Sequence, residues 1–549
     1  MQYVDEVPRL QDETSRDLVL LFAAPLMGAA AGGMGWGIRG QYGHEWGAMV
    51  PGVLVGFALV FLFSQRLSSL TAARAVALTA LGFMFGGIMT YGQTVGLTHD
   101  TPLVGNDAAY RWGMVGLFVK GGLWIGFGGA FLGIGLGGKK YRCREMLKLY
   151  LVLFVLVFFG IQLLNRPYVP GTDRELPWFF FPGGAGEERA LPWIYFSDHW
   201  NWEPENLEMD PRPEVWGGLL AAFIGLVTYV GYFKRDRLAF NMALVGVLAG
   251  GLGFTLGQTL QAKHSWTPNW VTDFDLYLHT SLPAIFPEAF FSLMGWNWWN
   301  MMETTFGLVL GFVLGLGLWF NRKHISGANT SNHFTMNPKV EWVLIFIYVV
   351  MLYLWSVLRH ENFVDLVGVY VDWVGANSFL KDVVDLLAAK LDDFVDLVGD
   401  YPFGMGLIPL VGILGGRFWP YLFSLPLVAV SIAGITYKIT DKVHPYTDRF
   451  LLFILPLAVM TIVALIFERR GRQGQSGRTF ARYGLILAVV VYFSLNFVFF
   501  GYPWATLPNG GRHTNNWIFL RCSELLIFAA LLLHRRDLPF RVDQRANQD

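Results

Sequence analysis

Residues 82–102 read GFMFGGIMTYGQTVGLTHDTP, an apolar, glycine-rich stretch that ends in a short polar run. Residues 246–268 repeat the pattern as GVLAGGLGFTLGQTLQAKHSWTP, and both contain Gly-Gln-Thr, four further residues, a histidine and then Thr-Pro. An apolar run of this length is typical of a transmembrane helix, and small residues such as glycine let such helices pack closely. The two stretches therefore predict two related membrane-spanning helices.

The similarity extends into the apolar segments on either side of these stretches. Trp46 opens the preceding segment of the first copy and Trp216 that of the second, each followed by glycine. The following segments end in LGIGLGG at 132–138 and LGLGLWF at 314–320. Spans 1–4 and 5–8 are therefore interpreted as two copies of a four-helix unit. Because each copy has an even number of spans, both cross the bilayer in the same direction, which predicts a parallel repeat.

The composition of the whole chain is typical of a bundle of membrane helices. Apolar residues make up 54% of the 549 positions and charged residues only 15%, whereas about a quarter is usual in soluble domains. The formal net charge is zero, so the charge gives no indication of nucleic acid as a partner. The predicted fold is an all-α polytopic membrane protein with about 13 to 14 transmembrane helices. The candidate spans are 18–38, 46–64, 75–94, 112–138, 148–164, 215–233, 239–260, 301–320, 341–358, 418–436, 449–467, 483–500 and 516–533, with 400–416 as a further short span or a re-entrant segment.

Lysine and arginine in short loops set the predicted orientation, because such loops stay on the cytoplasmic side of the membrane. Four basic segments meet this description, namely 139–147, 234–237, 469–482 and the tail from residue 534. We therefore expect a multi-pass protein of the plasma (inner) membrane with both termini in the cytoplasm.

The chain divides into three predicted regions. Residues 1–140 form the first four-span repeat, and 141–325 form the second, which carries long extracytoplasmic loops. Residues 326–549 form a C-terminal membrane half. Within that half, 359–399 has the apolar spacing of an amphipathic helix, which we expect at the outer interface.

Charged residues and histidines gather in the loops predicted on the extracytoplasmic side. The first such loop, GIRGQYGHEWG, holds Arg39, His44 and Glu45, and the last, PNGGRHTNNW, holds Arg512 and His513. Guanidinium groups bind carboxylate, phosphate or sulfate through paired hydrogen bonds. Arg39 and Arg512 are therefore predicted to bind the acidic group of a substrate, and His513 is predicted to lie beside them.

The duplicated Gly-Gln-Thr runs supply uncharged polar groups near the same level of the membrane. Gln93 and Asp100 of the first run and Gln258 of the second are the further predicted substrate-binding residues. Together with the span count and the duplication, they favour a multi-pass transporter. Its substrate would be a small polar solute, anionic or sugar-like, that moves through a site lined by the two runs.

Two alternatives to a transporter stay open. A membrane-embedded transferase would act on a lipid-linked or carbohydrate substrate. His44 or Glu45 would be its general base, His99 or His264 would assist, and Arg39 or Arg512 would hold a phosphate. A non-catalytic scaffold subunit of a membrane complex is the third hypothesis. The chain contains no HExxH or CxxC motif, so no metal ligands are predicted and no cofactor is indicated. The predicted partners are the lipid bilayer and either a small polar solute or a lipid-linked substrate.

Two charged residues fall inside apolar spans. Lys120 lies in GLFVKGGLWIGF and Glu303 in MMETTFGLVLGF, and the two occupy similar positions when the fourth and eighth spans are aligned. A charge at the centre of a bilayer costs about 2.5–3.5 kcal/mol on insertion scales, so each residue needs a partner or water. The sequence therefore predicts an intramembrane ion pair between Lys120 and Glu303.

Overall fold

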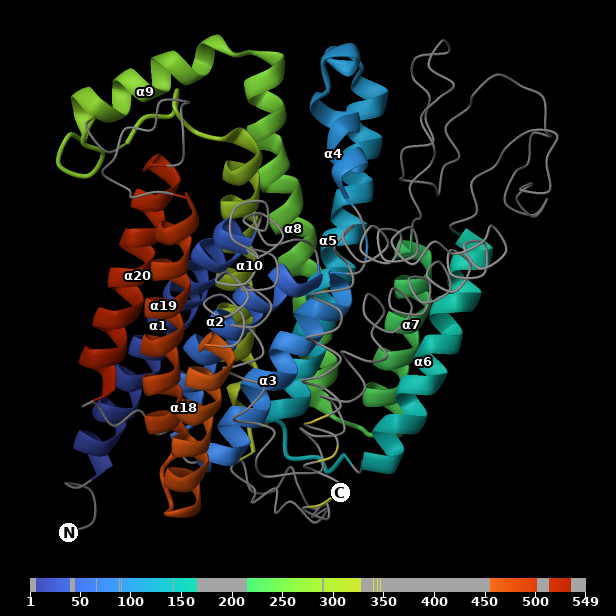
Figure 1. Cartoon of the computed structure of the whole chain (residues 1–549), viewed down its shortest axis with the longest axis vertical. Helices are drawn as coiled ribbons and strands as arrows, with labels where there is room; N and C mark the ends of the chain where they lie inside the picture. The colour runs from blue at the N-terminus through green and yellow to red at the C-terminus, as the bar shows by residue number, and fades with distance from the viewer. Residues whose placement is uncertain are drawn as a thin grey trace, which may run out of the picture. The chain divides into compact units, whose positions relative to one another are not determined.

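The described part of the structure, a computed structural model, consists of helices joined by short connections. It comprises residues 6–39, 45–164, 215–326, 455–500 and 513–534, apart from positions 66, 88, 90, 142, 289 and 290, together with positions 339, 343 and 346. Within these residues the chain is almost entirely helical and has no strand. The helices are shown in Figure 1, and their bounds are α1 Glu6–Arg39, α2 Glu45–Phe63, α3 Ser69–Gly86, α4 Gly92–His99, η1 Thr101–Leu103, α5 Asp107–Leu136, α6 Cys143–Leu164, α7 Trp216–Thr228, η3 Tyr229–Phe233, α8 Arg237–Trp266, α9 Asn269–Ser281, α10 Trp298–Phe320, η4 Arg322–His324, α18 Leu455–Arg472, α19 Gly477–Phe500 and α20 His513–His534.

Seven of the described helices are long and apolar enough to cross a membrane. The predicted all-α fold with several membrane-spanning helices is confirmed in this form. The predicted amphipathic segment 359–399 and the short apolar segment 400–416 lie outside the described residues. The seven candidate spans are Asp17–Arg39, Ser69–Gly86, Asp107–Leu136, Trp216–Phe233, Arg237–Trp266, Trp298–Phe320 and Asn515–His534.

The chain forms two compact units. The first contains residues 1–140, 151–330 and 469–549, and the second contains 141–150 and 331–468. All side chains discussed below belong to the first unit.

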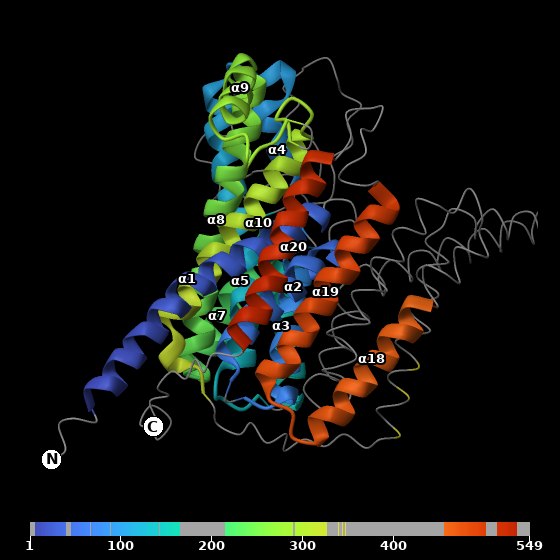
Figure 2. The ribbon, with the colours of Figure 1, turned by 90° about the vertical axis from the view of Figure 1, so that its left-hand side faces the viewer.

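Two helix pairs in the first unit pack through glycine. Helix α1 lies against α10, and α5 lies against α8, while α10 also contacts α8 (Figure 2). A Cβ atom on Gly28 of α1 would collide with the backbone oxygen of Gly311 in α10, and one on Gly250 of α8 would collide with that of Gly121 in α5. Such close backbone contact is typical of helices that pack within membranes. These two contacts fix which side chains of α1, α5, α8 and α10 face one another.

The two Gly-Gln-Thr runs adopt different local structures. In the first copy the helix is interrupted: α3 ends at Gly86, and the eight-residue helix α4 begins only at Gly92. The Phe83 carbonyl, which accepts from the Gly87 backbone N–H at 3.2 Å, also accepts from the Trp124 indole at 2.8 Å, so α5 is tied to the end of α3. In the second copy the run lies within the continuous helix α8. The first run therefore follows a break between two helices, a feature that the sequence did not reveal. The segment 69–99 that contains this break is called the discontinuous span below.

The segment between α8 and α10 is folded around a small hydrophobic cluster. Helix α9 contributes Val271 and Leu278, and the following connection contributes Phe291, Leu293 and Trp296. Asp275 of α9 accepts from the Leu293 backbone N–H at 2.6 Å, which ties the helix to this connection. The cluster also contacts the N-terminal part of α20 through Trp517 and Ile518. It thus holds the beginnings of α10 and α20 together.

Candidate functional site

Arg39 is the last residue of α1, and this helix ends inside the protein. The side chain is only 2% exposed. Its guanidinium carbon lies 5.1 Å from the ring centre of Trp36, 5.0 Å from that of Trp124 and 5.6 Å from that of Tyr91. Aromatic faces attract a cation at these distances, most strongly where water is excluded. Three rings therefore hold one buried cation in place.

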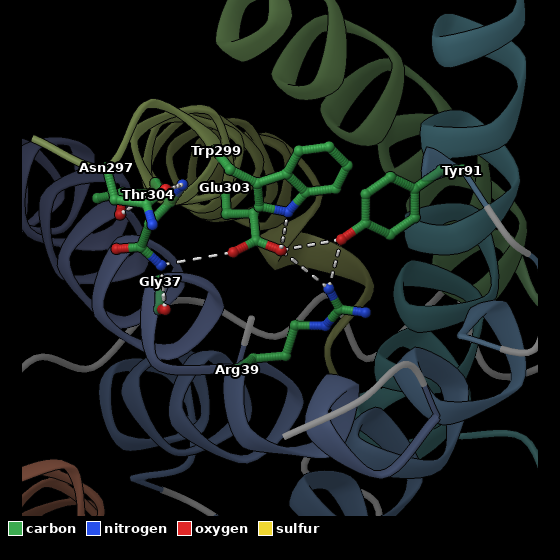
Figure 3. A network of polar contacts seen from close by, with 8 residues as sticks. Gly37, Arg39, Tyr91, Asn297, Trp299, Glu303 and Thr304 are labelled. Atoms are coloured by element: carbon green, nitrogen blue, oxygen red, sulfur yellow. Dashed lines mark hydrogen bonds and ion pairs between the residues drawn. The ribbon is translucent and has the colours of Figure 1, made fainter. Parts of the chain in front are cut away.

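Glu303 of α10 receives hydrogen bonds from several donors that come from different parts of the chain (Figure 3). The Arg39 Nη1 atom lies 3.4 Å from the Glu303 Oε1 atom, and the Tyr91 hydroxyl donates to the same oxygen at 2.9 Å. The Trp299 indole also donates to Oε1, at 3.3 Å, and the Asn300 amide donates to Oε2 at 3.4 Å. The carboxylate is only 1% exposed. Such a set of donors is what an ionised carboxylate needs when it is removed from water.

Tyr91 joins the ion pair to the break between α3 and α4. Its hydroxyl accepts from Arg39 Nη1 at 2.8 Å and donates to Glu303. The residue precedes the first residue of α4, whose N-terminus has no side-chain hydrogen bond to cap it. Tyr91 thus links the ion pair to the N-terminal end of α4.

The cation at ion-pair distance from Glu303 is Arg39, not the predicted Lys120. Lys120 of α5 is fully buried, and its ammonium group donates to the Thr94 hydroxyl of α4 at 2.9 Å. The aligned positions of Lys120 and Glu303 gave the wrong pairing because α10 packs on α1, whose last residue is Arg39. Lys120 instead links α5 to the discontinuous span.

The two Gly-Gln-Thr runs meet directly, since α4 packs on α8. The Gln258 amide donates to the Thr98 hydroxyl at 2.6 Å, and the Trp266 indole donates to the Thr98 carbonyl at 2.9 Å. His99 lies 3.2 Å from the Gln261 amide nitrogen through its Nε2 atom. These contacts form a row of polar groups that follows α4 from Thr94 to the partly exposed His99.

The two predicted histidines of the runs contact neighbouring tryptophans of α10. His264 stacks on Trp298, with ring centres 4.1 Å apart and planes inclined by 11°. The ring centre of His99 lies 6.5 Å from that of Trp299, which itself donates to Glu303. Asp100 is 59% exposed, and its carboxylate lies 3.8 Å from the His99 Nδ1 atom. Asp100 therefore lies at the surface end of the polar row.

Several predicted site residues cannot be placed in this arrangement. His44 and Arg512 lie outside the described residues, and so do the side chains of Glu45, Gln93 and His513. One residue of the PNGGRHTNNW motif whose side chain is described is Asn515, in α20. The Asn515 amide donates to the side-chain oxygen of Asn300, whose own amide donates to the Gly37 carbonyl at 2.7 Å.

Sequence reasoning missed Tyr91, the aromatic residues around Arg39 and the Asn300–Asn515 contact. The sequence held one indication of these residues, which is that several of them lie directly beside the motifs described above. Tyr91 immediately precedes the first Gly-Gln-Thr run, and Trp299 and Asn300 stand in the WNWWN motif directly before Glu303.

Comparison of the chain with protein-family models, with curated proteins and with solved structures finds no match.

Proposed function

We propose that this chain is a proton-coupled membrane transporter for a small polar solute with an acidic group. The observation that carries the proposal is the buried ion pair of Arg39 and Glu303, with side chains only 2% and 1% exposed. Charges inside a membrane protein are costly, and they typically mark ion or substrate pathways. Here the pair lies beside a discontinuous span, which is where many secondary transporters bind their substrates.

The ion pair can exchange its anion. When a proton binds Glu303, the carboxyl group loses its charge and its attraction for Arg39. The acidic group of a solute can then pair with Arg39 and accept from the Tyr91 hydroxyl, which already lies 2.8 Å from the guanidinium. When the solute leaves, Glu303 gives up its proton and pairs with Arg39 again. Arg39 has an anionic partner in both states, so a buried and unmatched charge is avoided throughout.

The discontinuous span offers a place for the necessary change in access. Arg39 and Glu303 are both sealed from solvent, so the conformation described is closed around them. Five residues, Gly87 to Tyr91, separate α3 from α4 and can change direction without disturbing a continuous helix. Movement of α4 would shift Tyr91, Thr94 and Thr98 together. We propose that this movement opens the site to one side of the membrane.

The proposal also includes the number of spans, the duplication and the orientation that the sequence predicts. We propose about 13 to 14 spans, a parallel duplication of a four-helix unit, and a plasma-membrane location with both termini in the cytoplasm. The direct contact between the two Gly-Gln-Thr runs supports the duplication, because a parallel repeat places corresponding segments at the same depth. Attachment of an impermeant thiol reagent to a cysteine at position 105 or at position 140 tests the orientation, since only the first should react from outside.

The transferase alternative receives less support from the described residues. His99 and His264 would be its assisting residues, but His264 stacks on Trp298 and His99 contacts the Gln261 amide within the bundle. The proposed general bases, His44 and Glu45, cannot be placed. A transferase would use Arg39 to hold a phosphate, but it would give Glu303 no role.

Proton movement in proteoliposomes tests the transporter. The wild-type protein is reconstituted with a pH-sensitive dye inside the vesicles, and sodium salts of D-gluconate, L-lactate, phosphate or sulfate are added outside. At least one anion should acidify the interior faster than in protein-free vesicles. Glu303→Gln should abolish this acidification but retain exchange of labelled anion across the membrane, because glutamine mimics the protonated carboxyl group.

The exposed pair Arg521–Glu524 supplies a matched control. Both side chains are 50% exposed, and they lie 3.0 Å apart on α20. Glu524→Gln should leave acidification unchanged. The proposal is wrong if none of the four anions moves protons, or if Glu303→Gln acidifies the vesicles as fast as the wild type.

A further inference from the structure

The hydrogen bonds of Gln258 leave one of its two polar atoms without a partner. The Thr98 hydroxyl donates to the Val95 carbonyl at 2.7 Å, so its oxygen can only accept from Gln258. The Gln258 nitrogen must therefore face Thr98, and the Gln258 Oε1 atom points elsewhere. This oxygen is buried and has no hydrogen-bond partner among the described residues, although the residue is 0% exposed.

The same argument applies to Gln261, which follows Gln258 by about one turn of α8. The His99 Nδ1 atom lies 3.0 Å from the Val95 carbonyl, which can only accept, so Nδ1 carries a proton. The Gln261 side-chain nitrogen lies 3.2 Å from the Nε2 atom of the same ring, so the Gln261 oxygen points elsewhere. The Gln261 Oε1 atom is buried and without a partner in the described structure, and the residue is 4% exposed.

A third unpartnered polar atom continues this row. His264 follows Gln261 by three residues, and its Nδ1 atom is buried without a hydrogen bond to any described residue. Its ring is fixed against Trp298 by stacking. Buried polar groups are nearly always hydrogen-bonded, so unmatched atoms at three positions spaced by three residues along α8 indicate a polar ligand, and the two amide oxygens among them require one that donates.

We infer that Gln258 and Gln261 bind hydroxyl groups of the transported solute, so that the solute is a hydroxylated organic acid. This inference rests on the proposed function, because Arg39 would bind the acid group while the second Gly-Gln-Thr run binds the hydroxyls. A hydroxyl supplies the donor that each amide oxygen lacks. The flat Trp298–His264 stack beside these oxygens suits the apolar face of a short polyol chain.

A metal cation is the competing occupant of these oxygens. Hard cations prefer carboxylate ligands, and the unpartnered atoms of Gln258 and Gln261 are neutral amide oxygens. Among the described residues, no group of three or more histidine, cysteine, aspartate or glutamate side chains is arranged to hold a metal ion. The chemistry of this row therefore favours hydroxyl groups.

Binding to the purified, full-length protein tests the inference without requiring transport. D-Gluconate and n-hexanoate have the same number of carbon atoms and the same acid group, but only gluconate carries hydroxyls. Titration calorimetry should show gluconate binding at least tenfold more tightly than hexanoate. Gln258→Leu and Gln261→Leu should each weaken gluconate binding about tenfold, the loss expected for one hydrogen bond in a buried site. Gln473→Leu, at an exposed glutamine, is the control and should bind as the wild type does.

The possible results separate this inference from the proposed function. The inference is wrong if the wild type binds the two acids with equal affinity or does not bind gluconate at all. This comparison uses only the wild-type protein, so it does not depend on the variants being stable. The inference is also wrong if sodium ions stabilise the wild-type protein more than choline does and if this difference is lost in Gln258→Leu. That result would assign the amide oxygens to a bound cation. Gluconate binding with the expected selectivity but without proton movement would support the inference and exclude proton-coupled transport. If anions drive proton movement but gluconate is not preferred over hexanoate, the proposed transport function is supported and the inference about hydroxyl groups is wrong.

Discussion

A double-mutant cycle on Arg39 and Glu303 tests whether the ion pair organises the core of the first unit. The perturbations are Arg39→Met, Glu303→Gln and the combination of the two. Removing one partner of a buried pair typically costs about 3–5 kcal/mol, because the remaining charge is buried without its counterion. Replacing both partners leaves no unmatched charge, so the double variant should lie within about 1.5 kcal/mol of the wild type.

The surroundings of the pair make the two single changes unequal. In Glu303→Gln the arginine keeps its charge, because a guanidinium does not lose its proton in a protein, and it retains its contacts with the Tyr91 hydroxyl and three aromatic faces. In Arg39→Met the carboxylate keeps the Tyr91, Trp299 and Asn300 donors, and it can also take up a proton. We therefore expect Glu303→Gln to cost about 4–5 kcal/mol and Arg39→Met about 3 kcal/mol. Lowering the pH should reduce the destabilisation of Arg39→Met, because protonation removes the charge of Glu303. It should not reduce the destabilisation of Glu303→Gln.

Denaturant titration in detergent micelles measures the four proteins under one set of conditions. A parallel cycle on Arg521 and Glu524 gives the scale for an exposed pair, for which a coupling energy below about 1 kcal/mol is expected. Destabilisations that simply add in the Arg39–Glu303 double variant would show that the two residues do not stabilise each other. In that case the ion pair would lose its place in the proposed transport cycle.

Three further predictions follow from the packing and charges of the first unit. Gly311→Ala places a methyl group against the Gly28 backbone and should destabilise the protein by about 1–3 kcal/mol in the same titration, whereas Gly56→Ala, where a Cβ has ordinary contacts, should be neutral or stabilising. Arg322→Gln removes a partly exposed pair with Asp17, 2.8 Å apart, and should cost less than about 1 kcal/mol, with the difference vanishing in high salt. Burial, followed by the charges of Lys323 and Arg237, lowers the pKa of His324 below its usual 6.5. The folded state then resists protonation of His324 more than the unfolded state does, so the free energy of unfolding should fall as the pH drops from above 6.5 toward the folded-state pKa. Denaturant titrations at pH 7.5 and pH 5.5 should show a smaller fall for His324→Gln than for the wild type.

The helical membrane character of the chain could be predicted because it depends on composition and on the length of apolar runs. The need of Glu303 for a partner could also be predicted, since a charge in an apolar span is costly wherever the neighbouring helices lie. The identity of that partner could not. It depends on the contact of α1 with α10, which is set by the fit of Gly28 and Gly32 against Gly311 and Gly307. Glycines are so frequent in this sequence that their pairing across helices cannot be deduced from it.

The position of Arg39 illustrates a second limit of the sequence. The glycines that surround it in GIRGQYGHEWG indicate a turn, and a turn between two apolar spans is normally placed at the membrane surface. In the structure α1 ends at Arg39 with the guanidinium enclosed by Trp36, Tyr91 and Trp124, so the end of the helix is buried. Only the tertiary packing of these rings distinguishes a buried helix end from a surface loop.

The end of α1 and the contacts of Arg39 explain why an exchangeable anion suits this site better than an exchangeable cation. The carbonyl groups at the C-terminal end of a helix carry partial negative charge, which favours the cationic Arg39 at the end of α1. The residue before α4 is Tyr91, whose hydroxyl donates to Glu303. An anion that replaced Glu303 on Arg39 would meet the same Tyr91 hydroxyl. A cation that took the place of the Arg39 guanidinium would have to displace it from its contacts with three aromatic rings. The mobile charge in the proposed cycle is therefore the negative one, and Glu303 is the residue whose protonation permits the exchange.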